Sequence, residues 1–107
     1  MSAPGDPGEG GAPGFAADAA CARWTYAGAL TFAEAGPVLE AASALALPRD
    51  GVVDCSSIGA FDSAAIAVLL ALKRRAAVEG RRIVFTGLAA RLEALATLYD
   101  VEEMLAG

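Results

Sequence analysis

A strand, a polar turn and a helix follow one another in the middle of the chain, and this pattern constrains the fold most. Val52–Cys55 is a short apolar run, which predicts a central strand covered on both faces. Ser56–Ala60 is predicted to be a loop. A helix is expected from Ser63 to about Glu79, with Asp62 or Ser63 as its N-cap residue.

A second strand and helix are predicted after this unit. Gly80 suits the left-handed position just past the end of a helix. Arg81–Gly87 predicts a strand, and the helical spacing of the apolar residues over Leu88–Tyr99 predicts another helix. Val101–Leu105 is expected to form a last helical turn or a short strand.

The beginning of the chain changes character at about residue 15. Met1–Gly14 contains five Gly and three Pro and no large apolar residue after the first position, so it is predicted to be a disordered tail. Residues 15–107 are expected to form one domain. A short strand near Phe15 and a second over Ala22–Tyr26 are predicted to begin it, with a turn at Asp18–Ala20.

A helix is predicted between these strands and the central one. Thr31 is a suitable N-cap, and Glu34 three residues later completes a capping box. The helix is expected to continue to about Leu45 and to be followed by a turn at Pro48–Gly51. The residues expected on its apolar face are Phe32, Ala35, Leu39, Ala42 and Leu45.

The predicted order is strand, strand, helix, strand, helix, strand, helix. Alternating strands and helices predict an α/β domain with a largely parallel sheet and helical crossovers. The first two strands would add an antiparallel edge, so the sheet is expected to be mixed.

The charge of the chain argues against nucleic acid as a partner. The net charge is −5, whereas a nucleic-acid binder needs a basic face to neutralise phosphates. The basic residues cluster only at Lys73–Arg75 and Arg81–Arg82, near one predicted helix end. A solvated helix end with favourable dipole interactions is the simplest interpretation of this cluster.

Hydropathy and cysteine content bear on the location of the protein. No apolar run approaches the roughly 20 residues that span a bilayer, so direct membrane insertion is not expected. Cys21 and Cys55 occur without a CxxC motif or a secretory signal, which is typical of a reduced, cytoplasmic protein. Both are predicted to be small buried apolar residues, with a redox pair as the alternative.

Catalysis and metal binding find little support in the sequence. The chain contains no histidine, which removes the usual nucleophile–base pairs and the commonest metal ligand. The phosphate-binding motifs GxxxxGK[ST] and GxGxxG are absent. Asp54 and Asp62 could together hold Mg²⁺, but Asp is also the expected residue at a strand end and an N-cap. We therefore expect no enzyme activity, no metal and no cofactor.

The helix that starts near Ser63 carries more apolar surface than a helix on a sheet needs. Its large apolar residues spread over roughly 200° at 100° per residue, whereas a stripe of about 100° or somewhat more is sufficient. The face expected on the sheet consists of Ala65, Leu69, Leu72 and Ala76. The second face consists of Ser63, Ile66, Ala67, Leu70 and Arg74. This second face either binds a protein partner or is covered by a neighbouring helix of the same domain.

Two roles are consistent with the position of Ser63. It lies where the helix dipole and free backbone N–H groups accumulate, so its simplest role is to cap the helix. The alternative is a phosphorylation switch, because a phosphate there would add about two negative charges to the second face.

The residues from Val52 to Leu70 resemble the central signature of STAS domains, the sulfate-transporter and anti-sigma-factor-antagonist module. In that signature, a strand ending in Asp is followed by a short loop and then by a hydrophobic residue, Asp, Ser or Thr, a small residue and Gly. Phe61–Ala64 matches it, and Ala65 stands at the Gly position. The similarity continues through Gly80–Leu88 and Leu92–Leu105. It implies a STAS-like mixed, mostly parallel sheet of four to five strands with three to four helices.

The ending Leu98–Leu105 and the small size are most similar to MlaB-type STAS proteins. These are cytoplasmic subunits of a bacterial ABC transporter that moves phospholipid between the two membranes of the envelope and supports outer-membrane lipid asymmetry. The resemblance implies binding to the ATPase subunit, support of transporter assembly or activity, and a peripheral place on the inner membrane through that partner. The contact residues that it implies lie at the helix start and are Phe61, Asp62, Ser63 and Ala64.

The anti-sigma-antagonist branch of the same family is the alternative. There the residue matching Ser63 is phosphorylated by a partner serine kinase, the anti-sigma factor, and phosphorylation abolishes binding. Many antagonists carry a further helix beyond the position of Leu105, which favours the transporter branch for this chain. A small lipid- or nucleotide-binding domain is a third, weaker hypothesis.

Overall fold

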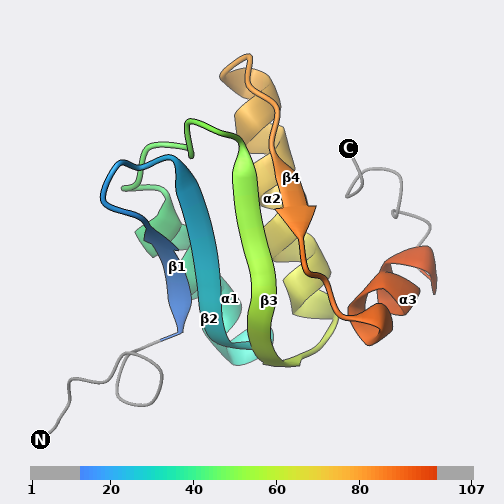
Figure 1. The fold of residues 1–107 in the computed structure, drawn as a ribbon. Helices are drawn as coiled ribbons and strands as arrows, with labels where there is room; N and C mark the ends of the chain where they lie inside the picture. The colour runs from blue at the N-terminus through green and yellow to red at the C-terminus, as the bar shows by residue number, and fades with distance from the viewer. Residues whose placement is uncertain (1–12, 99–107) are drawn as a thin grey trace, which may run out of the picture.

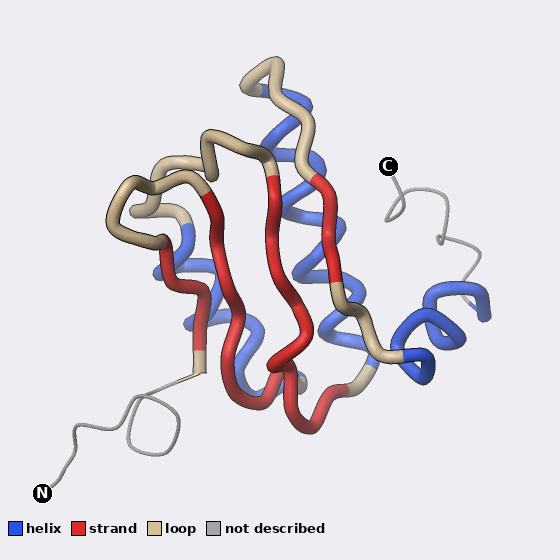
Figure 2. The backbone as a smooth tube through the Cα atoms, viewed as in Figure 1, coloured by secondary structure: helices blue, strands red, loops and turns tan. Residues whose placement is uncertain are grey.

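The fold places two long helices behind a four-stranded sheet, with a third helix beside them (Figures 1 and 2). The computed structural model describes residues 13–98. The elements are β1 (Gly14–Ala17), β2 (Arg23–Leu30), α1 (Phe32–Ala42), β3 (Val52–Phe61), α2 (Ser63–Val78), β4 (Val84–Thr86) and α3 (Ala90–Leu98). Their order is the predicted one.

The sheet is mixed and mostly parallel, as predicted. Its strand order is β1-β2-β3-β4, with β1 antiparallel to β2 and the other two pairs parallel. The long β2–β3 pairing runs from Arg23 opposite Val52 to Leu30 opposite Phe61. Because these two strands end at the same level, the helices that follow them begin side by side.

Strand β3 is longer than the sequence predicts. Ser56–Ala60, predicted to be a loop, is part of a strand that continues to Phe61, so that prediction is wrong. The register explains the error: Thr25–Ala27 on β2 lies opposite Asp54–Ser57 on β3, so β3 has one extra residue there. A second shift of the same kind follows near the strand end. Such bulges interrupt the alternation of apolar and polar side chains by which a strand is recognised in sequence.

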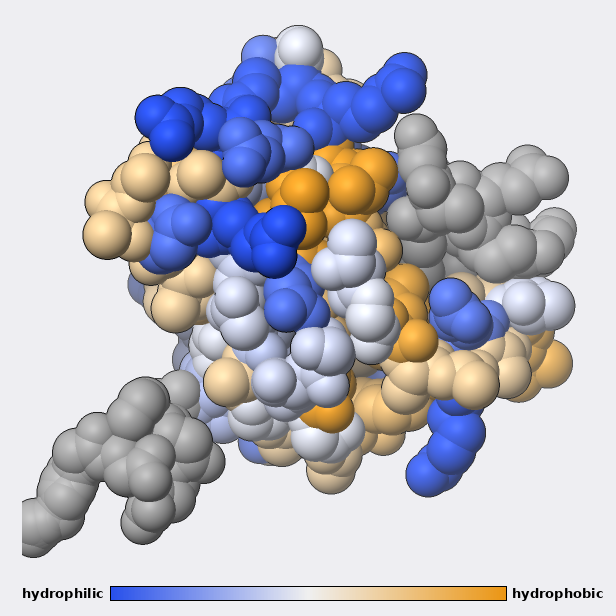
Figure 3. All heavy atoms as spheres, in the orientation of Figure 1, coloured by the Kyte–Doolittle hydropathy of each residue, from blue (hydrophilic) through white to orange (hydrophobic). Residues whose placement is uncertain are grey.

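One face of the sheet is buried under the helices and the other is open. Trp24, Tyr26 and Val53 are fully buried on the helix side. Thr25 lies directly opposite Asp54, and both belong to the open face. Figure 3 views this face and shows polar side chains mixed with apolar ones. The prediction that β3 is covered on both faces is therefore wrong, because its two-sided apolar appearance extends over only four residues.

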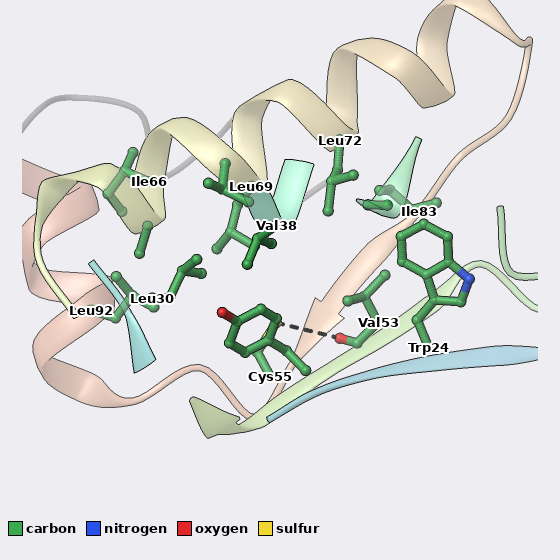
Figure 4. Close-up of a cluster of buried hydrophobic side chains, with 14 of the residues drawn as sticks. Trp24, Leu30, Val38, Val53, Cys55, Ile66, Leu69, Leu72, Ile83 and Leu92 are labelled. Carbon is green, nitrogen blue, oxygen red and sulfur yellow. Dashed lines mark hydrogen bonds between the residues drawn. The ribbon is translucent and has the colours of Figure 1, made fainter. Parts of the chain in front are cut away.

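The core lies between the sheet and the helices (Figure 4). Leu69, Leu72 and two alanines of α2 are buried there, which confirms the face predicted to lie on the sheet. Phe15 extends the core across β1, with its ring centroid 5.5 Å from that of Trp24. The buried residues of this core come from several elements and include Trp24, Leu30, Val38, Val53, Cys55, Ala65, Ile66, Leu69, Leu72, Ala76, Ile83, Leu92 and Ala96.

Two predicted elements are shorter in the structure. Helix α1 ends at Ala42 rather than Leu45, and the Arg75 guanidinium donates hydrogen bonds to the carbonyls of both residues, which holds the chain that leaves the helix. Strand β4 covers Val84–Thr86 rather than Arg81–Gly87. Its expected beginning is bound to α2 instead, where the Lys73 ammonium donates to the Ile83 carbonyl at 2.9 Å.

Near the beginning of the chain, the first strand and the predicted tail overlap by one residue. Strand β1 begins at Gly14, the last residue assigned to the predicted tail. The other tail residues before position 13, and the element predicted over Val101–Leu105, lie outside the described residues.

Gly51 and Gly80 have similar backbone conformations but differ in the space available for a side chain. Both adopt left-handed conformations, with φ of +73° and +70°. A Cβ at Gly51 would lie 2.6 Å from the Arg82 carbonyl oxygen, whereas a Cβ at Gly80 would meet nothing within 4 Å. We expect Gly80→Ala to lower the free energy of unfolding by about 1 kcal/mol. Gly51→Ala should lower the free energy of unfolding by ~2 kcal/mol more than Gly80→Ala, because the added Cβ also clashes with the Arg82 carbonyl. Urea denaturation measures both changes. Equal losses of stability for the two variants would show that the backbone clash is easily relieved.

Candidate functional site

The candidate site lies where β2 and β3 end and α1 and α2 begin. Leu30 and Phe61 are register partners at the ends of the two strands. The next residues, Thr31 and Asp62, are the N-caps of α1 and α2. Two helix N-termini separated by about 30 residues in sequence therefore lie side by side, at the lower edge of the sheet in Figure 1.

The Asp62 carboxylate joins these two helix starts. Its Oδ1 accepts a hydrogen bond from the Ala64 backbone N–H at 2.8 Å, which caps α2. Its Oδ2 accepts from the Phe32 backbone N–H at 3.1 Å, the first N–H of α1. Helix N-termini leave several N–H groups without intrahelical partners, and one side chain here satisfies a donor of each helix. Of the two N-caps considered from the sequence, Asp62 is the one present.

A second carboxylate holds the start of α1. Glu34 Oε1 accepts from the Thr31 backbone N–H at 2.7 Å and from the Thr31 hydroxyl, so the predicted capping-box pair is present. These hydrogen bonds hold the pKa of Glu34 below its usual value, while the neighbouring charge of Asp62 opposes that shift. The paired helix starts therefore carry two acidic groups close together.

Ser63 is the first residue of α2 and its side chain is exposed to solvent. Phe61 before it is half-buried, and the Arg91 guanidinium of α3 lies 5.9 Å from its ring centroid. Ala64 after it is half-buried, and Ala65, at the family's Gly position, is fully buried. The structure thus presents the Ser63 hydroxyl at the surface while its neighbours hold the helix to the domain.

The second face of α2 is narrower than predicted. Ile66 is 4% exposed and belongs to the core cluster that also contains Leu92 of α3 (Figure 4), so its predicted place on the exposed face is wrong. The alternative explanation, a neighbouring helix of the same domain, holds for this residue because α3 packs against α2. The rest of the face reaches solvent, with Leu70 half-buried. We call this row the α2 strip; it consists of Ser63, Ala67, Leu70 and Arg74.

Phe32 is a surface residue that sequence reasoning placed in the core. Its side chain is 84% exposed, although it was expected on the apolar face of α1. The buried residues of this helix are Val38 and Ala42. At 100° per residue, Phe32 lies only about 20° around the helix from Leu39, which packs against the core, so the pattern of α1 carries no signal of its exposure. Its backbone N–H bonds to Asp62, so Phe32 stands next to the start of the α2 strip.

Asp54 and Asp62 do not form a shared cation site. Asp54 lies in the pairing region with β2 and β4, where Oδ1 accepts from the Ser56 N–H at 2.9 Å and from its hydroxyl at 2.7 Å. These hydrogen bonds lower the pKa of Asp54. The seven residues between the two carboxylates belong to β3, which rises about 3.3 Å per residue. Within residues 13–98, no group of three acidic, Cys or His side chains gathers as metal ligands would.

The mixed sheet and the exposed Asp-Ser helix start are consistent with the STAS resemblance of the sequence. The family model described as "Mlab, STAS domain" matches residues 14–106, so the chain belongs to the STAS domain family and is of the MlaB type. This confirms the predicted family. No curated protein matches the sequence significantly. Over residues 13–98, no helix has the length and apolar character required to cross a bilayer.

Substitutions at the helix start should separate capping from surface exposure. Asp62→Ala removes both hydrogen-bond acceptors and should lower the free energy of unfolding by about 1–2 kcal/mol. Asp62→Asn should lose less, because Asn keeps one acceptor oxygen and is itself a good N-cap. Ser63→Ala should change the free energy of unfolding by less than about 0.5 kcal/mol, as measured by urea denaturation. A loss at Ser63 as large as that at Asp62 would contradict this assignment of the cap.

Proposed function

We propose that this chain is a STAS accessory protein that binds the ATPase subunit of a phospholipid ABC transporter and supports its assembly or activity. Membership in the MlaB type is the observation that carries this proposal. The contact surface that we propose is the α2 strip together with the helix start at Phe61, Asp62 and Ala64.

The composition of the α2 strip supports docking. Ser63, Ala67, Leu70 and Arg74 recur at intervals of four, three and four residues, which aligns them along one side of the helix. The small side chains of Ser63 and Ala67 allow close approach of a partner backbone, and Leu70 adds apolar area. Arg74 supplies a charge at the far end, where it orients the partner.

The chemistry of the helix start supports binding rather than catalysis. The carboxylates of the paired helix starts belong to Asp62 and Glu34, and both accept backbone hydrogen bonds. The chain contains no histidine that could act as a base for the hydroxyl. We therefore propose a cytoplasmic, non-enzymatic subunit that reaches the inner membrane only through its partner.

A second candidate function is an anti-sigma factor antagonist that is switched by phosphorylation of Ser63. The exposure of the Ser63 side chain favours it, because a kinase needs access to the hydroxyl. A phosphate there would add about two negative charges beside Asp62 and would alter the docking face. The partner would then be a serine-kinase anti-sigma factor.

Affinity purification of the tagged full-length chain from its native cells should distinguish the two functions. An ABC-transporter ATPase that co-purifies and binds directly when purified supports the first. A serine kinase related to histidine kinases that does the same supports the second. If neither binds directly, both proposals fail.

Ser63→Glu should weaken binding to the purified ATPase subunit by about tenfold or more. The substitution places a longer, charged side chain where the proposed contact is close, and an unpaired charge at an interface is costly. Ser63→Ala is the matched control, and its affinity should stay within about threefold of that of the unmodified chain. Isothermal titration calorimetry measures both, with equal thermal midpoints showing that the fold is intact. An unchanged affinity of Ser63→Glu would remove Ser63 from the interface.

A further inference from the structure

We infer that Phe32 is the apolar anchor of the docking surface and that the partner receives it in an apolar pocket flanked by basic side chains. This inference rests on the proposed function, because it extends the α2 strip across the paired helix starts onto α1. It adds a residue outside the Asp-Ser motif and specifies the chemistry of the partner surface.

The exposure and position of Phe32 set it apart from other surface residues. Within residues 13–98, three large hydrophobic side chains are strongly exposed, namely Phe32, Val78 and Leu98. The last two lie at the C-terminal ends of α2 and α3, whereas Phe32 lies beside the cap of Ser63's helix. Aromatic side chains are enriched at the centres of interfaces, where a few residues carry most of the binding energy.

Phe32 is also held in place before any partner binds. Its backbone N–H donates to Asp62 Oδ2 at 3.1 Å, and the preceding residue, Thr31, donates its N–H to Glu34 at 2.7 Å. The backbone that leads into Phe32 is thus fixed by the side chains of Glu34 and Asp62. Since ordering of interface residues weakens association, a preorganised aromatic residue binds with less loss of entropy.

The charges around Phe32 indicate a basic partner surface. Glu34 and Asp62 are close enough to influence each other electrostatically, and both belong to the caps next to Phe32. Arg91, above the Phe61 ring, is the basic residue on this side. The seven other basic residues lie at the start of β2, before β3 and β4, or in the C-terminal half of α2, and these segments lie toward the opposite end of the sheet (Figure 1). They are Arg23, Arg49, Lys73, Arg74, Arg75, Arg81 and Arg82.

The decisive comparison is Phe32→Ala against Leu98→Ala in the full-length chain, with the purified ATPase subunit as the probe. Phe32→Ala should weaken binding at least about 30-fold, as expected for a central aromatic contact. Leu98→Ala removes a similarly exposed apolar side chain from α3, and its affinity should stay within about threefold of that of the unmodified chain. Phe32→Leu should recover part of the affinity. Both side chains are exposed, so all variants should share the thermal midpoint of the unmodified chain.

Charge-neutral variants test the basic rim of the pocket. Glu34→Gln combined with Asp62→Asn removes both charges and leaves one acceptor oxygen at each cap, whereas Asp62 itself accepts with two oxygens. Asp62→Asn alone is the control for the lost acceptor, and the salt dependence of the association rate reports the charge. The association rate of this variant should fall about tenfold at low salt and should depend less on salt than that of the unmodified chain. An unchanged rate and salt dependence would overturn the assignment of basic groups to the partner.

The outcomes separate this inference from the proposed function. If the ATPase subunit binds the unmodified chain and Phe32→Ala equally, the inference fails and the proposed function stands. If it does not bind the unmodified chain, both fail. If Phe32→Ala weakens binding and Ser63→Glu does not, the Phe32 anchor stands without the Ser63 contact. A dimer of the chain alone that Phe32→Ala dissociates would identify a second copy as the occupant and overturn the inference.

Discussion

The parallel pairing of β2 with β3 is the constraint on which the rest of the site depends. The two strands end at the register pair Leu30 and Phe61, so the helices that follow them begin at the same level. In this arrangement Asp62 accepts from the first N–H of α1 as well as from its own helix. A parallel pair requires a crossover connection, and here α1 is that crossover. The helix that links the two strands thereby becomes half of the candidate surface.

Structural roles and the proposed binding roles are divided between neighbouring residues at the paired helix starts. Asp62 and Glu34 use their carboxylates to satisfy backbone donors, whereas Phe32 and Ser63 direct side chains to solvent. A substitution at either exposed residue therefore alters the surface with little effect on the fold. A substitution at Asp62 alters both, so a loss of binding there does not by itself identify a contact. This division explains why an Asp precedes the Ser: the acid holds the helix start that presents the hydroxyl.

Local signals predict this fold better than they predict what it exposes. The capping box at Thr31 and the left-handed Gly80 were predictable because a few adjacent residues determine each one. The burial of Ile66 and the exposure of Phe32 depend instead on where α3 and α1 pack, which neither helix's own pattern specifies. The bulged half of β3 was missed for a related reason, since a bulge is defined by the partner strand. The family signature identified Ser63 but carried no information about Phe32, which lies on another helix.

The uneven distribution of charge contributes to stability, and in our proposal it also contributes to recognition of the partner. Helices α1 and α2 start at one end of the sheet, so their positive dipole ends lie beside Glu34 and Asp62. At the opposite end, Arg75 and Arg81 donate hydrogen bonds to backbone carbonyls at the end of α1 and after it. A basic partner near Phe32 would therefore approach carboxylates that are already partly neutralised by helix N–H groups. Its attraction should guide orientation and association rate, while the burial of the Phe32 ring provides most of the affinity.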